Sequence, residues 1–591
     1  MNTMKGICAF AFLLSLVACG GGGSSTPMPT PTPTPTPIPT PTPSGVNVSP
    51  SSATVALGAQ QAFTATSNGS PVAVNWSVAG VSGGNATVGT IDASGNYTGP
   101  STFPTPNTET VTATLQSDST KGGSAGVTVV FRNDNHLAQT VPIKLGTTGG
   151  NSTDLVNNGK TITCCSGTLG SLVQNGGTFF ILSNNHVLDK SDTGAAGNPI
   201  GQPGLVDNNC SAGAVVANLT TAAALKPTTI STTGACRGQP APCGPAPSNV
   251  DAAIATIVSG QVDTAGNILD LGAAGATSIA AAPPSATLAI PANVMSANEG
   301  VAKSGRTSGL TCSTLTSIST TVTVTYVASC GGANAFTAEY TGQLIISGGN
   351  FSAAGDSGSL VVTSDTARPL GLLYGGNSTS TSANPIQDVL SAFPGASMVG
   401  GADHKISCDP TASGPSAPPA PISPQQGQRV AAAQQKHGQA LMTDPAVQSV
   451  SIGASEDNPG EGALVIEISG PTRAPIPPTI DGVRTKVVAT AQAAPSTPAM
   501  LSTPDVESAI AVKENHVDTL MSEPGIQGVG VGRSSDDPSK TAIVIYVLTG
   551  MERPAIPATL DGVRTKIVEG DRFRAFGWGK EREPARKCVN K

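Results

Sequence analysis

The sequence predicts a mainly β protein composed of several consecutive units. Short segments in which apolar and polar residues alternate recur along the chain and are separated by turns. The 70 glycines and 48 prolines favour turns, and only 11% of residues are charged, against about 25% in an average globular protein. A sequence pattern that occurs twice near the C-terminus predicts two units that each contain a helix as well as strands. A chain of 591 residues is long enough for roughly three to five domains.

The N-terminus has the features of an export signal. Lys5 precedes the apolar run 7–14, and Leu16-Val17-Ala18-Cys19 follows, as in a secretory signal peptide. This ending resembles the bacterial lipobox, which implies a lipoprotein signal peptide at 1–19 and lipidation of Cys19. An ordinary signal peptide with an incidental cysteine is the alternative. We expect an extracytoplasmic protein held at the bacterial outer membrane or cell surface by the lipid on Cys19, because no later apolar stretch is long enough to span a bilayer.

A spacer and a β-sandwich are predicted next. Residues 20–44 are a Thr/Pro-rich linker that favours extended polyproline II. Residues 45–131 carry the alternating segments of a sandwich. The segments VNWSV (74–78) and GTIDASGNYTG (89–99) resemble bacterial Ig-like domains of the second group, which implies Trp76 as the core aromatic residue. A stalk is favoured for this domain over contact with a cell surface or a glycan.

Three short segments supply a candidate catalytic set of His186, Asp251 and Ser357. His186 follows the apolar run 178–182 and Asp251 precedes the run 252–255, both of which predict buried strands. A serine hydroxyl is a weak nucleophile until an imidazole accepts its proton, and an aspartate holds that imidazole in the required tautomer.

The alternative interpretation is a polar turn at GDSGS (355–359) and an ordinary loop histidine at 186. The chain contains five histidines, and only His186 lies at a predicted strand end upstream of both Asp251 and Ser357. The order His, Asp, Ser therefore favours a catalytic triad. Gly355 and Gly358 permit the tight backbone that turns N–H groups toward an oxyanion.

Residues 135–405 resemble a trypsin-like serine peptidase, specifically the narrow-leaf-type subgroup of plants and bacteria. The resemblance rests on GTLGSLV (167–173), FILSNNHVL (180–188), PIGQPGLVD (199–207), VDAAIA (250–255), KSGRTSGLT (303–311) and GDSGSLVV (355–362). It implies a chymotrypsin fold of two β-barrels, with His186 and Asp251 on the first and Ser357 on the second. It also implies an oxyanion hole formed by the N–H groups of Gly355 and Ser357. No activation cleavage site precedes residues 164–167, so we do not expect a new N-terminus that pairs with Asp356.

The same resemblance implies a substrate pocket beside the nucleophile. Phe351 would contribute apolar surface, and Tyr374, Gly375 and Gly376 would form one wall. Neither segment carries a carboxylate, and an unpaired cation is costly to bury. We therefore expect cleavage after small or apolar residues rather than after Lys or Arg, unless other loops reshape the pocket.

The cysteines predict disulfides, because an export signal places them in an oxidising compartment. Cys312 and Cys330 bracket an alternating segment and are predicted to staple a hairpin, and Cys236 with Cys243 is a second candidate pair. Nine cysteines remain after Cys8 and Cys19, so one is expected to be free or intermolecular, with Cys588 as the candidate. Since no paired C-x-x-C or HExxH pattern occurs, we expect neither a metal nor another cofactor.

The C-terminal part predicts two copies of a small α+β unit, at 427–490 and 507–570. After a linker at 406–426, LMTDPAVQSVSIG (441–453) recurs as LMSEPGIQGVGVG (520–532), and IPPTIDGVRTKVV (476–488) as IPATLDGVRTKIV (556–568). A linker at 491–506 joins the copies and a basic tail covers 571–591. His437 and His516 occupy equivalent helix positions, and helix packing or capping is favoured there over a ligand site.

These features predict a lipid-anchored serine endopeptidase that acts on protein or peptide substrates through an acyl-enzyme. The alternative is a catalytically inactive surface-binding or adhesion protein with a peptidase-like scaffold. A further interpretation makes the C-terminal repeats a regulatory cover over the catalytic unit. The net charge of −7 gives no reason to expect nucleic acid as a partner.

Overall fold

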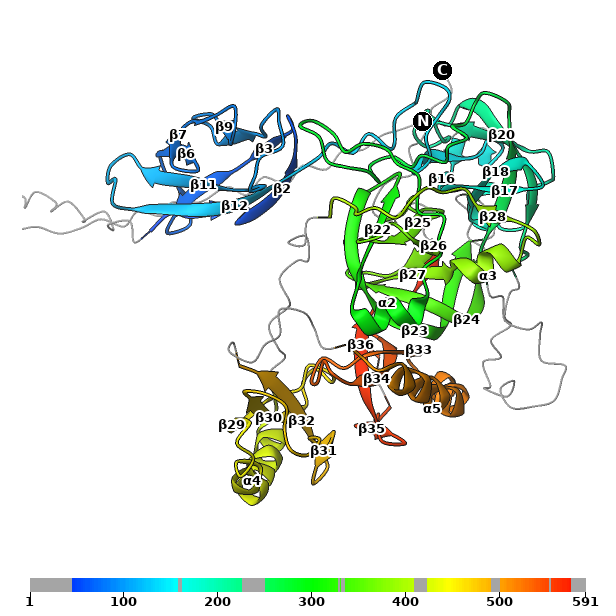
Figure 1. Cartoon of the computed structure of the whole chain (residues 1–591). Helices are drawn as coiled ribbons and strands as arrows, with labels where there is room; N and C mark the ends of the chain where they lie inside the picture. Colours follow the sequence, from blue (N-terminus) through cyan, green and yellow to red (C-terminus); the bar gives the residue numbers. More distant parts are fainter. Residues whose placement is uncertain are drawn as a thin grey trace, which may run out of the picture.

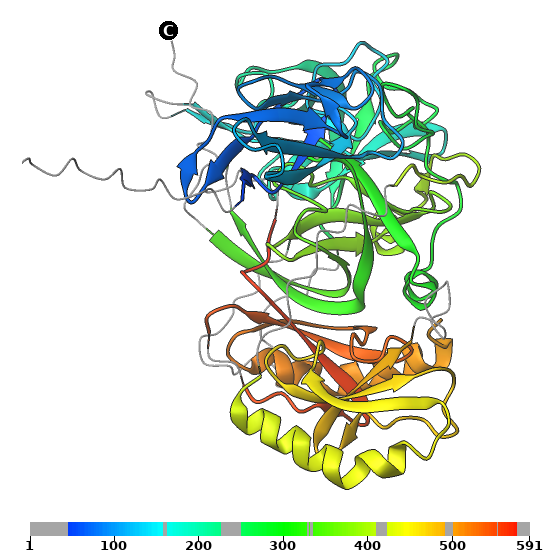
Figure 2. The same cartoon turned by 90° about the vertical axis from the view of Figure 1, so that its left-hand side faces the viewer.

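The structure, a computed structural model, describes residues 45–157, 162–225, 250–327, 330, 335–408, 422–490, 500–551 and 554–575. The predicted signal peptide with Cys19, the Thr/Pro-rich linker, the Cys236–Cys243 pair and Cys588 lie outside the described residues. The described residues confirm a mainly β protein with several sheets, as Figures 1 and 2 show. None of the helices among them is long and apolar enough to cross a membrane.

Residues 47–130 form a β unit with a core of its own. Trp76 is buried in that core beside Phe63 and Tyr97, in agreement with the expectation for Trp76. The strands of this unit pair in three sheets, whose orders are β2 (Ser52–Ala56), β12 (Gly122–Val130), β11 (Thr108–Leu115), β6 (Val74–Val78), β7 (Val81–Ser82); β3 (Gln60–Ala62), β10 (Asn96–Thr98), β9 (Gly89–Ile91), β8 (Gly84–Asn85); and β1 (Asn47–Ser49), β4 (Thr64–Ser67), β5 (Ser70–Pro71).

The central part of the chain contains two larger sheets that share one hydrophobic core. Leu182 and Ala253 of the first sheet lie in the same buried cluster as Val362 and Leu372 of the second. The first sheet has the order β16 (Gly167–Leu169), β13 (Thr147–Asn151), β19 (Pro199–Gln202), β20 (Ala214–Ala222), β21 (Ala253–Ile257), β18 (Thr178–Ser183), β17 (Ser171–Asn175), β28 (Ser397–Met398). The second begins with β22 (Gly300–Gly305), β25 (Leu360–Thr363), β26 (Pro369–Gly376), β27 (Ser380–Pro385), β24 (Ala335–Ser347), β23 (Gly309–Val327). The remaining elements here are β14 (Leu155–Asn157), β15 (Ile162–Cys164), α1 (Asn185–Leu188), α2 (Pro291–Ala297) and α3 (Ile386–Ser391).

The second sheet continues into the C-terminal repeat. Strand β33 (Ile526–Arg533) pairs antiparallel with β23 and is followed by β34 (Thr541–Leu548), β36 (Val563–Gly570) and β35 (Thr559–Leu560). With β37 (Arg574–Ala575), which pairs with β23 and β26, the sheet has 11 strands. Figure 1 shows β33, β34 and β36 next to β23 and β24. The hydroxyls of Ser317 and Tyr546 are 2.7 Å apart across this junction. The second repeat thus extends the sheet of the central unit. Pairing with β33 also covers an edge of β23 that would otherwise be open.

The two repeats have the same order of elements, close to the predicted one. The first contains α4 (Pro424–Leu441), β29 (Val447–Ala454), β30 (Gly462–Ile468), β31 (Thr479–Ile480) and β32 (Val483–Ala489), and the second begins with α5 (Thr503–Ser522). Both helices begin earlier than expected, so the predicted linkers at 406–426 and 491–506 are too long. The reason is capping: Ser423 accepts a hydrogen bond from the Gln426 N–H, and Ser502 one from the Asp505 N–H.

The equivalent histidines of the two helices make equivalent contacts. His437 Nε2 lies 2.9 Å from Asp481 Oδ2, and His516 Nε2 lies 2.9 Å from Asp561 Oδ2. Each contact ties a helix to the turn before the last strand of its repeat. This agrees with a packing role for both histidines.

The repeats also bind each other through contacts that are exchanged between equivalent residues. Arg484 donates to the carbonyl of Thr565 at 2.7 Å, and Arg564 donates to the carbonyl of Thr485 at 2.8 Å. Asp536 accepts from the Glu456 N–H, while Asp457 accepts from the Ser535 N–H, both at 2.6 Å. Such a self-complementary pattern is typical of two-fold interfaces, here between two parts of one chain.

We expect Arg484→Ala to lower the free energy of unfolding of the repeat pair by about 2–3 kcal/mol. The Arg484 side chain is buried and also bonds Glu461 Oε2 at 2.8 Å, so its loss leaves several buried acceptors unpaired. Denaturant titration of the full chain measures the change. Lys486→Ala is the control, since it removes the more exposed ion pair with Glu456 and is expected to cost less than about 1 kcal/mol. Equal losses for the two variants would contradict the prediction.

Candidate active site

Strand register brings His186 and Asp251 together. Strands β18 and β21 pair antiparallel with Ser183 opposite Ala253, so the end of one strand lies beside the start of the other. His186 follows β18 in the single turn α1, and Asp251 precedes β21. His186 Nδ1 lies 2.6 Å from Asp251 Oδ2, and the His186 N–H donates to Asp251 Oδ1 at 3.2 Å. Both side chains are fully buried, and this carboxylate is thus placed to orient the imidazole.

Tyr326 is a further partner of the carboxylate that sequence reasoning missed. Its hydroxyl donates to Asp251 Oδ2 at 2.8 Å and lies 2.6 Å from the Tyr340 hydroxyl. Burial, together with the nearby Asp251 charge, raises the pKa of Tyr326 well above its ordinary value, so the hydroxyl keeps its proton as a donor. Tyr326 lies on β23 of the second sheet, 75 residues from Asp251 along the chain. No local sequence signal predicts that contact.

The loop that carries Ser357 packs against the first sheet. Ser357 O accepts a hydrogen bond from the Thr168 N–H at 2.8 Å. Gly358 has φ +94°, and a Cβ there would lie 2.1 Å from Ser183 Oγ and 2.3 Å from Thr168 O. Only glycine allows this approach, which brings the Ser357 loop beside the segment that leads to His186.

Ser357 and His186 share no hydrogen bond among the described residues. Ser357 Oγ donates to the carbonyl of Tyr374 at 3.3 Å. His186 Nε2 is buried and has no hydrogen-bond partner among the described residues. The structure thus joins two of the three predicted residues directly and leaves the imidazole nitrogen that would face the serine unpaired. Catalytic hydrogen bonds are often long or misaligned without substrate.

The predicted oxyanion loop is held by a buried lysine. Lys303 Nζ lies 3.5 Å from Asp356 Oδ2, and both side chains are fully buried. Asp356 also accepts hydrogen bonds from the N–H groups of Thr307 at 2.8 Å and Ala353 at 2.9 Å. This internal cation and these backbone donors together hold the Asp356 carboxylate in place. Gly355 has φ +99°, and its N–H and that of Ser357 donate to no acceptor within the described part of the chain.

The predicted pocket residues are all buried. The Phe351 ring is only 3% exposed and packs in a core cluster with Val301 and Leu373, so it does not provide the apolar pocket surface expected from the sequence. The Tyr374 ring packs 4.9 Å from the Tyr340 ring, centroid to centroid. Gly375 and Gly376 follow Tyr374 at the end of β26 and are paired with Ala575 and Arg574.

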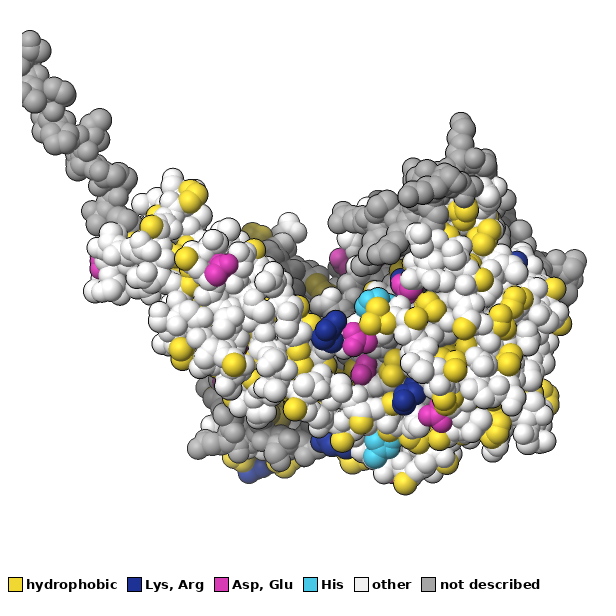
Figure 3. Space-filling view, turned by 90° about the horizontal axis from the view of Figure 1, so that it is seen from above, with side chains coloured by type: hydrophobic (Ala, Val, Ile, Leu, Met, Phe, Trp, Pro, Cys, Tyr) yellow, Lys and Arg dark blue, Asp and Glu magenta, His cyan; other side chains and the backbone are white. Residues whose placement is uncertain are grey.

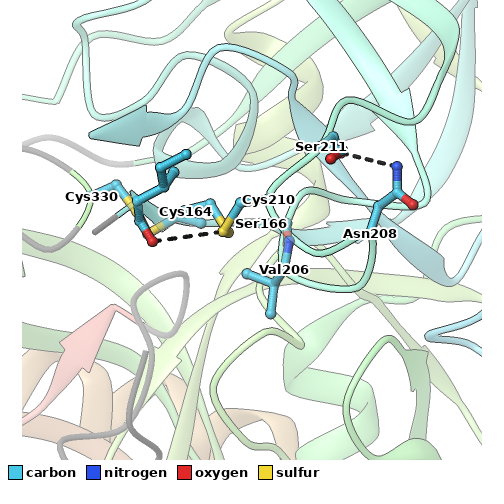
Figure 4. The surroundings of a disulfide bond; sticks show 9 residues. Cys164, Ser166, Val206, Asn208, Cys210, Ser211 and Cys330 are labelled. Carbon is cyan, nitrogen blue, oxygen red and sulfur yellow. Dashed lines mark hydrogen bonds between the residues drawn. A yellow bond between two sulfur atoms is a disulfide. The ribbon is translucent and has the colours of Figure 1, made fainter. Parts of the chain in front are cut away.

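The disulfides differ from the predicted pairing. Cys312 is bonded to Cys408 and Cys330 to Cys165, with Cα–Cα distances of 5.8 and 5.7 Å. The predicted Cys312–Cys330 hairpin is wrong because the alternating segment belongs to one strand, β23, of 19 residues. At about 3.3 Å per residue, the two cysteines lie at opposite ends of that strand. A third bond joins Cys164 to Cys210, next to Cys330 and Ser166 in Figure 4.

Asp207, the alternative carboxylate partner for the imidazole, binds a different side chain. Its carboxylate forms a two-pronged contact with Arg306, with Nε–Oδ2 and NH2–Oδ1 distances of 2.7 Å. On the face drawn in Figure 3, Lys, Arg, Asp and Glu side chains are few and scattered.

Comparison with known proteins gives limited similarity. No family model matches the chain, and no curated protein matches it. A solved structure of a glutamic acid-specific serine protease, described as using a histidine triad in substrate binding, has a TM-score of 0.26 and 17% identity and covers 43% of this chain and 100% of its own. A chymotrypsin of Cellulomonas bogoriensis has a TM-score of 0.24 and 18% identity, and covers 43% of this chain and 98% of its own.

Proposed function

We propose that the chain is a serine endopeptidase in which Ser357, His186 and Asp251 form the catalytic triad. The observation that carries this proposal is the buried 2.6 Å contact between His186 Nδ1 and Asp251 Oδ2, next to a glycine-shaped serine loop. Asp251 keeps the Nδ1 proton in place, so that Nε2 is left as the acceptor. The fully buried carboxylate, the tyrosine donor and the unpaired Nε2 of His186 together support this role.

The proposed reaction follows from these positions. Ser357 Oγ attacks the carbonyl carbon of a peptide bond while its proton moves to His186 Nε2. The N–H groups of Gly355 and Ser357 stabilise the oxyanion that forms. The imidazolium then gives its proton to the leaving amine, which leaves an acyl-enzyme that water hydrolyses by the same route.

The test is covalent labelling of the purified full-length chain with a fluorophosphonate probe. A peptidase is expected to take up one label per chain. A sample that is heat-denatured before the probe is added should take up none. The inactive-scaffold alternative is favoured by one observation, the contact of Ser357 Oγ with the Tyr374 carbonyl instead of the imidazole. Absence of labelling in the folded protein, both at full length and shortened to end at residue 570, would decide for that alternative.

Tyr326 is proposed as a positioning residue for Asp251. We expect Tyr326→Phe to lower kcat about tenfold to a hundredfold with little change in KM, because a hydrogen bond to a charged group contributes about 1.5–3 kcal/mol. Tyr340→Phe is the matched control, since it leaves the Tyr326–Asp251 contact in place. Steady-state kinetics on a peptide substrate measures both. The role fails if the two variants lose equal activity.

Cleavage after small or apolar residues stays the proposed specificity. No carboxylate occurs at 349–354 or 374–376, and Asp365, an alternative source of negative charge, lies on the surface beside Lys405 at 3.5 Å. Digestion of a peptide library followed by mass spectrometry measures the preference. Cuts mainly after Lys or Arg would refute it.

The proposed location is the bacterial outer membrane or cell surface, with Cys19 lipidated and residues 45–131 acting as an Ig-like stalk. The supporting observation is the lipobox-like sequence before Cys19, followed by a spacer and a β unit with its own core. Cys19→Ala should abolish incorporation of labelled palmitate and release the protein from membranes; unchanged incorporation would exclude lipidation at this residue.

A further inference from the structure

A short segment near the C-terminus pairs with β26, the strand that carries the predicted pocket residues Tyr374, Gly375 and Gly376. We call residues 571–575 the C-terminal strap. Its strand β37 (Arg574–Ala575) pairs antiparallel with β26, with Arg574 opposite Gly376 and Ala575 opposite Gly375. These glycines directly follow Tyr374, whose carbonyl accepts the Ser357 hydroxyl. In its N-to-C direction the strap therefore runs toward the nucleophile.

The strap fills the space between two strands of the site. Besides β26, it pairs in parallel with β23, where Arg574 is opposite Thr325, the residue before Tyr326. The Thr325 N–H donates to the carbonyl of Phe573 at 3.0 Å. The Phe573 side chain is fully buried in the cluster that holds Tyr326 and Tyr374. One face of the site is thus closed by the chain itself.

Polar contacts fasten the strap at its N-terminal end. Asp571 Oδ1 accepts a hydrogen bond from the Ser378 N–H at 2.7 Å, and its carbonyl accepts one from Asn377 Nδ2 at 2.9 Å. Gln527 binds the strap twice, through Nε2 to the Asp571 carbonyl at 2.9 Å and through Oε1 to the Phe573 N–H at 3.1 Å. Asp571 thus links the second repeat to the residues that follow Gly376.

The strap has the form in which extended peptides bind proteins. Peptides often add as an extra strand to an available sheet edge, so that backbone hydrogen bonds supply affinity. At Gly375 and Gly376 this edge is already paired, and a Cβ at Gly375 would lie 2.5 Å from Arg574 O. A substrate cannot add there until the strap leaves. His186 is 2% exposed and Ser357 is fully buried, as a closed site requires.

We propose that the C-terminal strap is an autoinhibitory segment that occupies the peptide-binding edge of β26 and must be displaced before an extended peptide substrate binds. This inference rests on the proposed peptidase function. Because the strap is tethered to the second repeat, it is present at a high effective concentration and competes strongly with free peptide. The alternative is that the segment only completes the fold of the second repeat.

Peptide hydrolysis and fluorophosphonate labelling of three purified full-length forms test the proposal: wild type, Asp571→Ala and Asp561→Ala. Asp571→Ala removes the side-chain anchor on Ser378 without touching the buried Phe573, and should raise kcat/KM for an apolar peptide about tenfold. Asp561→Ala is the matched control, because it removes an exposed aspartate of the same repeat that contacts His516, and should leave kcat/KM unchanged. A chain ending at residue 570 should be activated at least as strongly as Asp571→Ala.

The strap supplied as a separate peptide distinguishes inhibition from a folding role. The capped peptide Asp-Arg-Phe-Arg-Ala should inhibit the shortened chain competitively, whereas a scrambled peptide of the same composition should not. Equal kcat/KM for wild type and Asp571→Ala, in forms that all label and melt alike, would overturn the inference and leave the peptidase function standing. Failure of every folded form to label or to cleave peptide would overturn both. If the shortened chain does not fold, Asp571→Ala alone decides.

Discussion

Replacing Ser357 with alanine should abolish fluorophosphonate labelling and lower peptide turnover by three or more orders of magnitude. The reason is that the acyl-enzyme forms on Ser357 Oγ. In the alanine variant, a water molecule at that position is expected to attack the peptide carbonyl far more slowly than the serine hydroxyl does. His186→Ala should cost a similar factor, because the hydroxyl then has no base to accept its proton. The double variant should be little worse than either single variant, since the two residues act as one unit.

The matched control for this prediction is Ser359→Ala in the same loop. Ser359 Oγ donates to the Asp356 carbonyl at 2.6 Å and, within the described part of the chain, forms no hydrogen bond with His186 or Asp251. It should label normally, although a small loss of stability is expected. Full labelling of Ser357→Ala, or loss of labelling in both serine variants, would remove Ser357 from the role of nucleophile.

Asp251→Asn should keep the fold and lower turnover by about four orders of magnitude. The amide would donate a hydrogen bond to His186 Nδ1 and so place the ring proton on Nε2, which then cannot accept the serine proton. The side chain lies fully buried between His186 and Tyr326. Its packing should change little, because an amide and a carboxylate have nearly the same volume. Kinetics and thermal unfolding on the same samples separate the loss of turnover from any loss of stability.

Asp207→Asn is the comparison for this second prediction. Asp207 binds Arg306 through both oxygens, so its replacement should lower stability but leave turnover of the folded fraction nearly unchanged. Unchanged turnover in Asp251→Asn, with a large loss in Asp207→Asn, would reverse the assignment of the acid.

Local sequence patterns predicted the elements that carry His186 and Asp251. An apolar run before His186 and another after Asp251 indicated two buried strands, and strands β18 and β21 lie there. Their antiparallel pairing then sets the two residues side by side. The two repeats could also be predicted from the sequence, because a duplicated sequence indicates a duplicated structure. Each repeat helix begins before its predicted start, because the capping signals Ser423-Pro424 and Ser502-Thr503-Pro504 lie within the predicted linkers.

Contacts between distant strands escaped prediction. Tyr326 and Lys303 each act on a partner from another strand or loop, and nothing in their neighbouring residues identifies that partner. The cysteine pairing failed for the same reason: adjacency in sequence favoured Cys312 with Cys330, whereas a single long strand separates them. Phe351 was expected in a pocket, but its ring packs in the core.

By itself, the sequence determined the mainly β composition, the duplicated C-terminal unit and the candidate residues His186, Asp251 and Ser357. These depend on local periodicity, turn chemistry and residue type, which are written within a few neighbouring positions. The tertiary structure alone decided which cysteines pair, that the second repeat extends the sheet of the central unit, and that the C-terminal strap lies along β26. Those outcomes depend on which strand edges and buried polar groups meet. That is set by burial of surface and hydrogen-bond satisfaction over the whole chain.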